Sequence, residues 1–141
     1  MNVAERLQYE LRHNGYSMTN SRLLVCQTLA KHAPISMREV INRLGGKVDR
    51  ASIYRIVALF EELGIVRKIP TGWKYKLELS DKFTHHHHHA HCLSCRQIIT
   101  LPEDRLLEQS IEKIAQQQEF AITDHHIELH GYCSDCQQKA S

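Results

Sequence analysis

The sequence of 141 residues contains no run of about 18 apolar residues, so a transmembrane helix is not expected. Its first residues form no apolar signal segment, which makes the cytoplasm the expected location. No repeat of solenoid period occurs. No HExxH or similar catalytic pattern is present either, and a hydrolase would need a metal with an open position beside a general base. We therefore expect no enzyme, no catalytic residues, no small-molecule substrate and no membrane partner.

Cysteine and histidine are scarce in the first half of the chain. Four of the five cysteines and nine of the eleven histidines follow residue 84, and both are ligands of zinc and iron. Charge is divided too: residues 1–80 contain 13 Lys/Arg against seven Asp/Glu, whereas residues 81–141 contain five against nine. This asymmetry suggests two modules with different partners. The basic half could bind phosphate, although such a balance also suits an ordinary solvated surface.

The first 80 residues have the apolar spacing of short helices followed by a β-hairpin. We expect helices over residues 3–14, 19–33, 36–44 and 50–63. Thr19 is placed to cap the second helix, and Ser36 with Glu39 has the spacing of a capping box. Strands are expected over residues 65–69 and 73–79, around turn residues 70–72. The expected buried face of the second strand consists of Trp73, Tyr75, Leu77 and Leu79.

Short helices followed by a hairpin are typical of a winged helix-turn-helix, in which the last helix enters the major groove of DNA. Ser52, Tyr54 and Arg55 lie mostly on the polar side of that helix. The hairpin would bring four cations together, where they could touch phosphates: Arg67, Lys68, Lys74 and Lys76. A small helical domain that binds another protein is the alternative.

The second half of the chain is expected to be a small α/β domain over residues 85–141, joined by a hinge at residues 81–84. The pattern predicts a histidine-rich strand, a cysteine turn, a strand at 98–101, a helix over about 105–119, and strands near 120–123 and 126–132. Such a domain has little core of its own and often needs a metal or a partner subunit. The whole chain is expected to be α+β, with the winged-helix domain over residues 1–80.

Two CxxC turns, Cys92–Cys95 and Cys133–Cys136, are separated by 37 residues. Four thiolates complete the tetrahedral shell of one zinc ion, and a closed shell has no open position, so its role is structural. Disulfides are not expected in a chain without secretory features. A redox pair is the alternative. Cys26 lies on the apolar side of a helix and is expected to be a small buried hydrophobe.

Histidines form an uninterrupted run from His85 to His89, followed by Ala90 and His91. In a strand, odd-numbered positions face one way and even-numbered positions the other, so one strand could supply two metal sites. A loose loop that binds metal weakly is the alternative. Further ligand candidates elsewhere in the chain are Glu78, Glu108, His125, His126 and His130.

Together these features resemble the ferric uptake regulator family of bacterial metalloregulators over nearly the whole chain. The resemblance is carried by Thr19-Asn20-Ser21-Arg22, Ala51-Ser52-Ile53-Tyr54-Arg55, Tyr75-Lys76-Leu77-Glu78-Leu79, the histidine-rich strand that leads into Cys92, and residues 126–133. It implies a homodimer that binds a palindromic operator in double-stranded DNA when its sensing site holds metal. Residues 85–141 would then be the dimerisation domain.

By position, the resemblance implies three metal sites and a set of DNA contacts. Structural Zn²⁺ would be held by Cys92, Cys95, Cys133 and Cys136. The regulatory metal would be held by Glu78, His87 and His89, with His32 as a further candidate because the family's ligand in the first domain falls near Pro34. The second C-terminal site would consist of His86, His88, Glu108 and His125, where His88 replaces the more usual Asp. The DNA contacts would come from Tyr54 and Arg55, with Ser52 and Arg22 beside them.

Two departures from the family pattern affect the regulatory site. The segment between Glu78 and Cys92 is longer than usual, so Asp81 is an alternative to Glu78, and Thr100 stands where an acidic residue is common. Zinc-sensing relatives usually place a cysteine in this site, and none is available here, which favours Fe²⁺ or Mn²⁺. Thr100 in place of an acidic ligand argues against peroxide sensing. We expect Fe²⁺, with zinc, manganese or peroxide sensing as the alternatives. We expect a metal-dependent transcriptional repressor that controls metal-homeostasis genes. A metal-buffering protein is the alternative of a different class.

Overall fold

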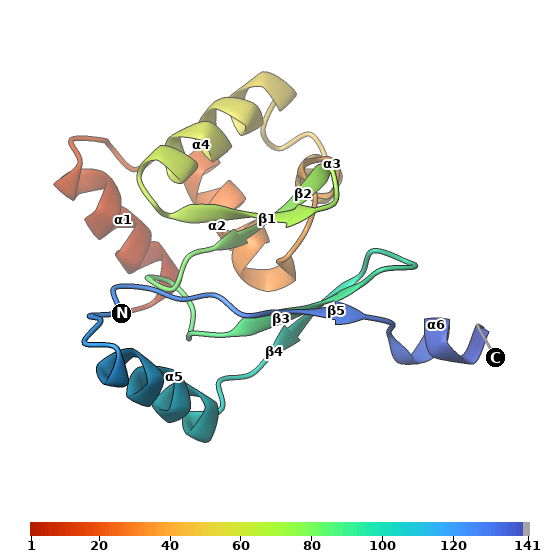
Figure 1. The fold of residues 1–141 in the computed structure, drawn as a ribbon. Helices are drawn as coiled ribbons and strands as arrows, with labels where there is room; N and C mark the ends of the chain where they lie inside the picture. The colour runs from red at the N-terminus through yellow and green to blue at the C-terminus, as the bar shows by residue number, and fades with distance from the viewer. Residues whose placement is uncertain (140–141) are drawn as a thin grey trace. The chain divides into compact units, whose positions relative to one another are not determined.

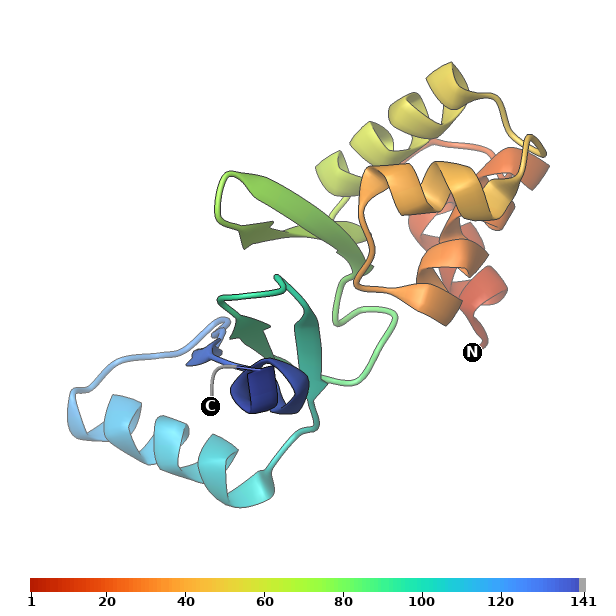
Figure 2. The same cartoon turned by 90° about the vertical axis from the view of Figure 1, so that its right-hand side faces the viewer.

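The computed structural model describes residues 1–139, which divide into two compact units. The first unit extends from Met1 to Thr84, and the second begins at His85. Figures 1 and 2 show that the first unit combines helices with a hairpin, and that the second combines a small sheet with two helices (Figure 1, Figure 2). Among the described residues, no helix is long and apolar enough to cross a membrane.

The first unit contains four helices and two strands, each begun by a local signal. They are α1 (Val3–His13), α2 (Asn20–His32), α3 (Met37–Leu44), α4 (Arg50–Glu62), β1 (Val66–Thr71) and β2 (Lys74–Leu79). Each helix starts after a side chain that accepts a hydrogen bond from a backbone N–H of the first turn, namely Asn2, Thr19, Ser36 or Asp49. The predicted cap at Thr19 and the capping box of Ser36 and Glu39 are therefore confirmed.

The core of the first unit is made by the apolar faces of its helices and strands. Its most deeply buried members include Leu7, Leu11, Val25, Leu29, Val40, Ile53, Phe60 and Leu77. Cys26 is buried among them as predicted, and this burial raises the pKa of its thiol to about 12. Phe83 packs against the same core, so residues 81–84 lie within the first unit.

The hairpin is joined to the helices by backbone hydrogen bonds. Strands β1 and β2 are antiparallel, and Ile35 exchanges two bonds of 3.0 and 2.7 Å with Leu77. The predicted burial of the second strand is correct for Leu77 and Leu79 only. Trp73 is 90% exposed and Tyr75 is 37% exposed, because Trp73 lies in the turn before the first paired residue of β2. Alternation in sequence does not show where a hairpin extends beyond the helices that cover it.

The second unit has a three-stranded sheet in the order β4-β3-β5. Its elements are β3 (His88–Cys92), β4 (Ile98–Leu101), α5 (Arg105–Gln117), β5 (Glu128–Gly131) and α6 (Ser134–Lys139). Strand β3 pairs antiparallel with β4 and parallel with β5. No residue of α5 is buried. The unit therefore has little apolar core within the described chain, as predicted.

Two features of the second unit differ from the sequence prediction. Residues 120–123 form no strand, because none of the described strands pairs with them, and Phe120 is 67% exposed. The strand predicted over residues 126–132 is limited to β5, and the chain then enters the unpredicted helix α6. A strand depends on a partner, and a propensity pattern does not supply one.

Candidate metal centres and nucleic-acid interface

The four cysteines of the two CxxC turns come together in the second unit. The first turn follows β3, and the second leads into α6. The four sulfur atoms all lie within 4.8 Å of one another, and Sγ of Cys95 is 3.8 Å from Sγ of Cys133. Sulfur atoms around a tetrahedral zinc are about 3.8 Å apart when each Zn–S bond is about 2.3 Å. The donor set and its spacing therefore fit a structural zinc ion.

Hydrogen bonds prepare this cluster for metal. Backbone N–H groups, first that of Cys133, lower the pKa of the Cys92 thiol to about 6. The Cys136 thiol differs, because its hydrogen bond with Cys133 raises its pKa to about 11. Because thiolates are the ligands, zinc would displace the proton that Cys136 retains near neutral pH, whereas Cys92 is already largely a thiolate there.

A second cluster joins β3 and its approach to α5 and to the segment before β5. His88 Nε2 lies 2.7 Å from one carboxylate oxygen of Glu108, and His125 Nε2 lies 2.6 Å from the other. His86 Nε2 is 3.2 Å from His125 Nε2. The structure thus brings together the four residues assigned to the second C-terminal site, with donor atoms within 4.8 Å of one another. Three imidazoles and a carboxylate suit Zn²⁺, Fe²⁺ or Mn²⁺.

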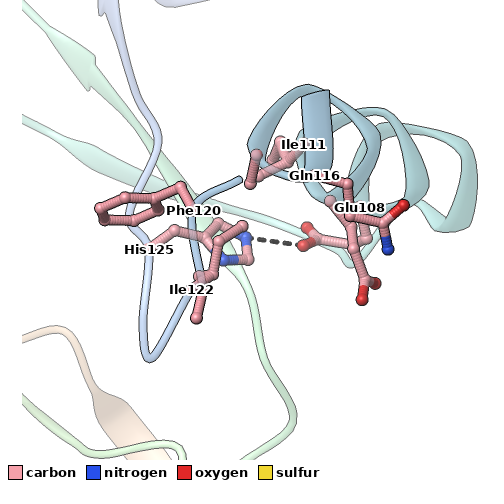
Figure 3. Close-up of a pocket in the computed structure, with 9 residues that line it drawn as sticks. Glu108, Ile111, Gln116, Phe120, Ile122 and His125 are labelled. Carbon is pink, nitrogen blue, oxygen red and sulfur yellow. Dashed lines mark ion pairs between the residues drawn. The ribbon is translucent and has the colours of Figure 1, made fainter. Parts of the chain in front are cut away.

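Hydrogen bonds within this second cluster fix the ring tautomer of His88. His88 Nδ1 accepts a bond of 3.3 Å from the backbone N–H of Ile127, so its Nε2 carries the proton that is donated to Glu108. Burial alone would raise the pKa of Glu108, but the bonds from His88 and His125 hold it below its usual value. Figure 3 shows the Glu108–His125 pair at the edge of a pocket of about 500 Å³, with Phe120 and Ile122 on its apolar side (Figure 3).

The residues predicted for the regulatory site belong to different units. In the first unit, Glu78 accepts a hydrogen bond of 2.6 Å from Arg67, which also pairs with Asp81 at 3.1 Å. In the second unit, the rings of His87 and His89 lie 4.9 Å apart, and His87 Nδ1 is 2.8 Å from the backbone oxygen of His85.

His32, the fourth residue considered for this site, ends α2 in the first unit. It lines a cavity of about 190 Å³ together with Lys31, Arg43 and Lys47. Three cations nearby oppose the binding of a further positive ion. This environment makes His32 the least favourable of the four expected ligands.

The predicted recognition surface is the exposed side of α4. Tyr54 and Arg55 are exposed there, whereas Ile53 and Ile56 face the core. Sequence reasoning missed how Arg55 is held: its guanidinium donates to Ser52 Oγ over 3.2 Å, and that hydroxyl donates to Asp49 over 2.6 Å. The three-residue spacing of Asp49 and Ser52, which is typical of a helix cap, could have indicated this arrangement. The Ser52 hydroxyl, followed by its backbone N–H, keeps the pKa of Asp49 below its ordinary value.

Arg22, the remaining predicted DNA contact, lies in the first turn of α2. Its guanidinium donates to the backbone oxygen of Ser17 over 2.5 Å and lies 5.6 Å from the ring centre of Tyr16. It therefore braces the loop between α1 and α2.

The sequence suggested that the four hairpin cations could contact phosphate, but the structure shows that Arg67 and Lys68 are paired with carboxylates. Arg67 pairs with two carboxylates, and Lys68 lies 3.3 Å from Glu61 and 4.5 Å from the Tyr75 ring centre. Lys74 lies beside the exposed Trp73, 5.4 Å from its ring centre. The turn therefore presents an aromatic side chain with a cation beside it.

Comparison with known proteins places these features in one family. The model of the ferric uptake regulator family matches residues 13–130. A ferric uptake regulation protein of Neisseria gonorrhoeae is 33% identical, and the alignment covers 92% of each chain. A peroxide-responsive repressor of Staphylococcus saprophyticus is 32% identical over 92% of this chain and 88% of the relative. The crystal structure of the Vibrio cholerae ferric uptake regulator superposes with a TM-score of 0.71 at 31% identity, covering 89% of this chain and 98% of that one.

The family model spans parts of both units, including α4 and β3, whereas Cys133 and Cys136 lie beyond the residues that it matches. The predicted α+β fold, with a winged helix followed by a small α/β unit, is confirmed by the structural match. The chain therefore belongs to the ferric uptake regulator family and is a metal-responsive transcriptional regulator, not an enzyme.

Proposed function

We propose that this protein is a homodimeric repressor that binds operator DNA when a regulatory metal links the donors of its two units. The observation that carries the proposal is the exposed pair Tyr54 and Arg55, with Arg55 held by a chain of hydrogen bonds on the last helix of a winged-helix unit. A helix in this position reads base edges in the major groove. A metal-buffering protein has no need of such a surface.

The regulatory ligands in this proposal are Glu78, His87 and His89, with Asp81 as the alternative carboxylate. Arg67 pairs with both carboxylates within the first unit, so a cation already offsets part of their negative charge. A divalent metal would compete with Arg67 for Glu78. Because Glu78 follows the wing and the two histidines belong to the second unit, metal binding would restrict the angle between the units, and hence the spacing of two recognition helices in a dimer.

Iron as Fe²⁺ is the proposed regulatory metal. The donors are oxygen and nitrogen, which suit Fe²⁺ and Mn²⁺, and the four cysteines of the second unit form their own cluster. Sensing of zinc, manganese or peroxide is the alternative within the family. The relatives at about one-third identity include both a ferric uptake regulation protein and a peroxide-responsive repressor, so similarity alone does not choose between them.

A second copy of the chain is the proposed partner of the second unit. Large apolar side chains are exposed on this unit: Leu106, Ile114, Phe120, Leu129 and Tyr132. Exposed apolar side chains in such number are typical of an interface, and two-fold dimers suit palindromic operators. Zinc at the cysteines would stabilise the unit that forms this interface. A repressor that binds chromosomal DNA would act in the cytoplasm.

The test is fluorescence anisotropy of labelled operator duplex at fixed salt, under anaerobic conditions, with zinc-loaded protein and buffered Fe²⁺, Mn²⁺ or Zn²⁺. We expect tight binding only when Fe²⁺ is added. Arg55→Ala should abolish binding without changing metal uptake, whereas Arg12→Ala, on the exposed side of α1, should bind normally. His87→Ala combined with His89→Ala should remove the metal response, and His13→Ala, which removes an exposed histidine of α1, should keep it. DNA affinity that ignores every metal would overturn the proposed switch.

A further inference from the structure

Three donor side chains on the sheet of the second unit belong to none of the clusters described above. Strands β3 and β5 run parallel, and His91 pairs in register with His130. Glu128 precedes His130 by two residues, so its side chain lies on the same face of β5. His91, Glu128 and His130 therefore project from two neighbouring strands on one side of the sheet.

Glu128 lies close to both imidazoles, with a different carboxylate oxygen facing each of them. Nε2 of His91 lies 3.8 Å from one carboxylate oxygen of Glu128, and Nε2 of His130 lies 3.4 Å from the other. The two imidazole rings are 5.2 Å apart between centres and inclined by 35°. Ligand atoms around a tetrahedral zinc with bonds of about 2.1 Å are about 3.4 Å apart. The two imidazoles would have to turn toward Glu128 for all three donors to meet one ion.

His91 is the member of the group that needs a partner. Its side chain is only 8% exposed, and its Nε2 has no hydrogen-bond partner among the described residues. A buried imidazole nitrogen without a partner is unfavourable, because water has been removed and nothing replaces it. The nearest charged oxygen, on Glu128, lies beyond hydrogen-bond distance at 3.8 Å. A metal between them would satisfy both groups.

We propose that His91, Glu128 and His130 form an additional binding site for a divalent cation of the Zn²⁺ or Fe²⁺ type. Two imidazoles and one carboxylate are a common donor set for these ions, and water would complete the shell. The site would cross-link β3 to β5. Both strands lead directly into the cysteine turns, since Cys92 follows His91 and Cys133 follows His130 by three residues.

The additional site would also neighbour the regulatory histidines. The ring centres of His89 and His91 are 6.4 Å apart on the same strand face. Occupation of one site would therefore fix the strand that carries the other. The inference does not depend on the regulatory assignment, because its three ligands all lie within the second unit.

The experiment counts bound metal in the full-length protein with zinc retained at the cysteines. Wild type, Glu128→Gln and His130→Ala are dialysed to equilibrium against buffered Co²⁺, and cobalt and zinc are measured by mass spectrometry. We expect each variant to bind one cobalt ion per chain fewer than wild type while keeping its zinc. His13→Ala is the control, because His13 is an exposed histidine at the end of α1 and belongs to none of the metal clusters. It should bind as much cobalt as wild type.

A second measurement covers the case in which a substitution disturbs the fold. Co²⁺ shifts the ring-proton resonances of its imidazole ligands far outside the normal NMR range. Wild type should show shifted signals that disappear in Glu128→Gln, a change that preserves the shape of the side chain. Equal cobalt counts and equal shifted signals in wild type and both variants would overturn the inference. Operator binding measured on the same samples separates this result from any failure of the proposed repressor function.

Discussion

Arg67 and Glu78 face each other across the hairpin, paired in register, with Nε 2.6 Å from Oε1. The guanidinium also reaches Asp81, so one cation holds both carboxylates that are candidates for the regulatory site. The proposed switch is therefore an exchange of ligands, in which metal replaces Arg67 at Glu78. The guanidinium of Arg67 and the carboxylates of Glu78 and Asp81 are already charged and already held in position by these contacts.

Replacement of Arg67 by methionine should raise the affinity for the regulatory metal. A hydrogen bond between charged groups contributes about 1.5–3 kcal/mol, and 1.4 kcal/mol is a tenfold change, so we expect a rise of roughly tenfold or more. Competition with a chelating fluorophore measures it. Lys68→Met, which removes a cation paired with Glu61 instead, is the control and should leave the affinity unchanged. A lower affinity in Arg67→Met would mean that Arg67 orients Glu78 for metal and does not compete with it.

Loss of the Ser52 hydroxyl should weaken DNA binding while the protein stays stable. Ser52→Ala keeps the backbone N–H that Asp49 accepts, so the helix cap survives, but Arg55 loses the group that orients it. We expect the dissociation constant for operator to rise several-fold, whereas the midpoint of thermal unfolding should fall only slightly, because Asp49 loses the Ser52 hydroxyl but keeps the backbone N–H. Anisotropy and circular dichroism measure the two quantities. Operator affinity equal to that of wild type would show that Arg55 does not need this support.

The contribution of Asp49 to the free energy of unfolding should decrease at acid pH. Its carboxyl pKa is lowered in the folded state from an ordinary value of 3.8, chiefly by the Ser52 hydroxyl. A depressed folded pKa means that the stabilisation is complete above pH 3.8 and is lost as pH falls through the folded value. The difference in unfolding free energy between wild type and Asp49→Ala should therefore shrink below that pH. Urea unfolding across the acid range tests this, and a difference independent of pH would contradict it.

Trp73 should report the approach of DNA to the wing. It is the single tryptophan of the chain, it is 90% exposed, and Lys74 lies beside it. In the free protein, iodide should quench its fluorescence efficiently. Operator binding should protect it, because the turn would enter the neighbouring groove beside phosphates. Quenching that is identical with and without operator would show that the tip of the wing remains in solvent.

Loss of one cysteine ligand should unfold the second unit and leave the first intact. Cys95→Ser should release zinc and convert the dimer to monomer, because the second unit has few buried apolar side chains of its own. The first unit keeps a separate core, so part of the helical signal should survive. Zinc analysis, size-exclusion chromatography and circular dichroism measure these effects. Cys26→Ala removes the cysteine outside the cluster and should retain full zinc.

The features predicted correctly from the sequence depend on interactions between residues close in the chain. Thr19 and Ser36 each cap a helix by accepting a hydrogen bond from the backbone N–H three residues later in the chain. The two cysteines of each CxxC pair likewise lie within one turn. His86 and His88 reach the same cluster, as their alternate spacing predicted, although β3 begins only at His88 and His86 precedes it. The expected strand at residues 120–123 failed because strand formation needs a partner, which the described chain does not provide there.

By itself, the sequence determined the order of the elements as far as α5, the two CxxC turns and the division of charge and metal ligands between two halves, because these follow from residue type and short spacing. Only the tertiary structure decided which distant groups meet. From the sequence, Arg67 could have contacted phosphate, but the register of β1 and β2 places it opposite Glu78. His91 and His130, 39 positions apart, became neighbours because β3 and β5 pair in parallel, and hydrogen bonding between strands has no counterpart in local spacing.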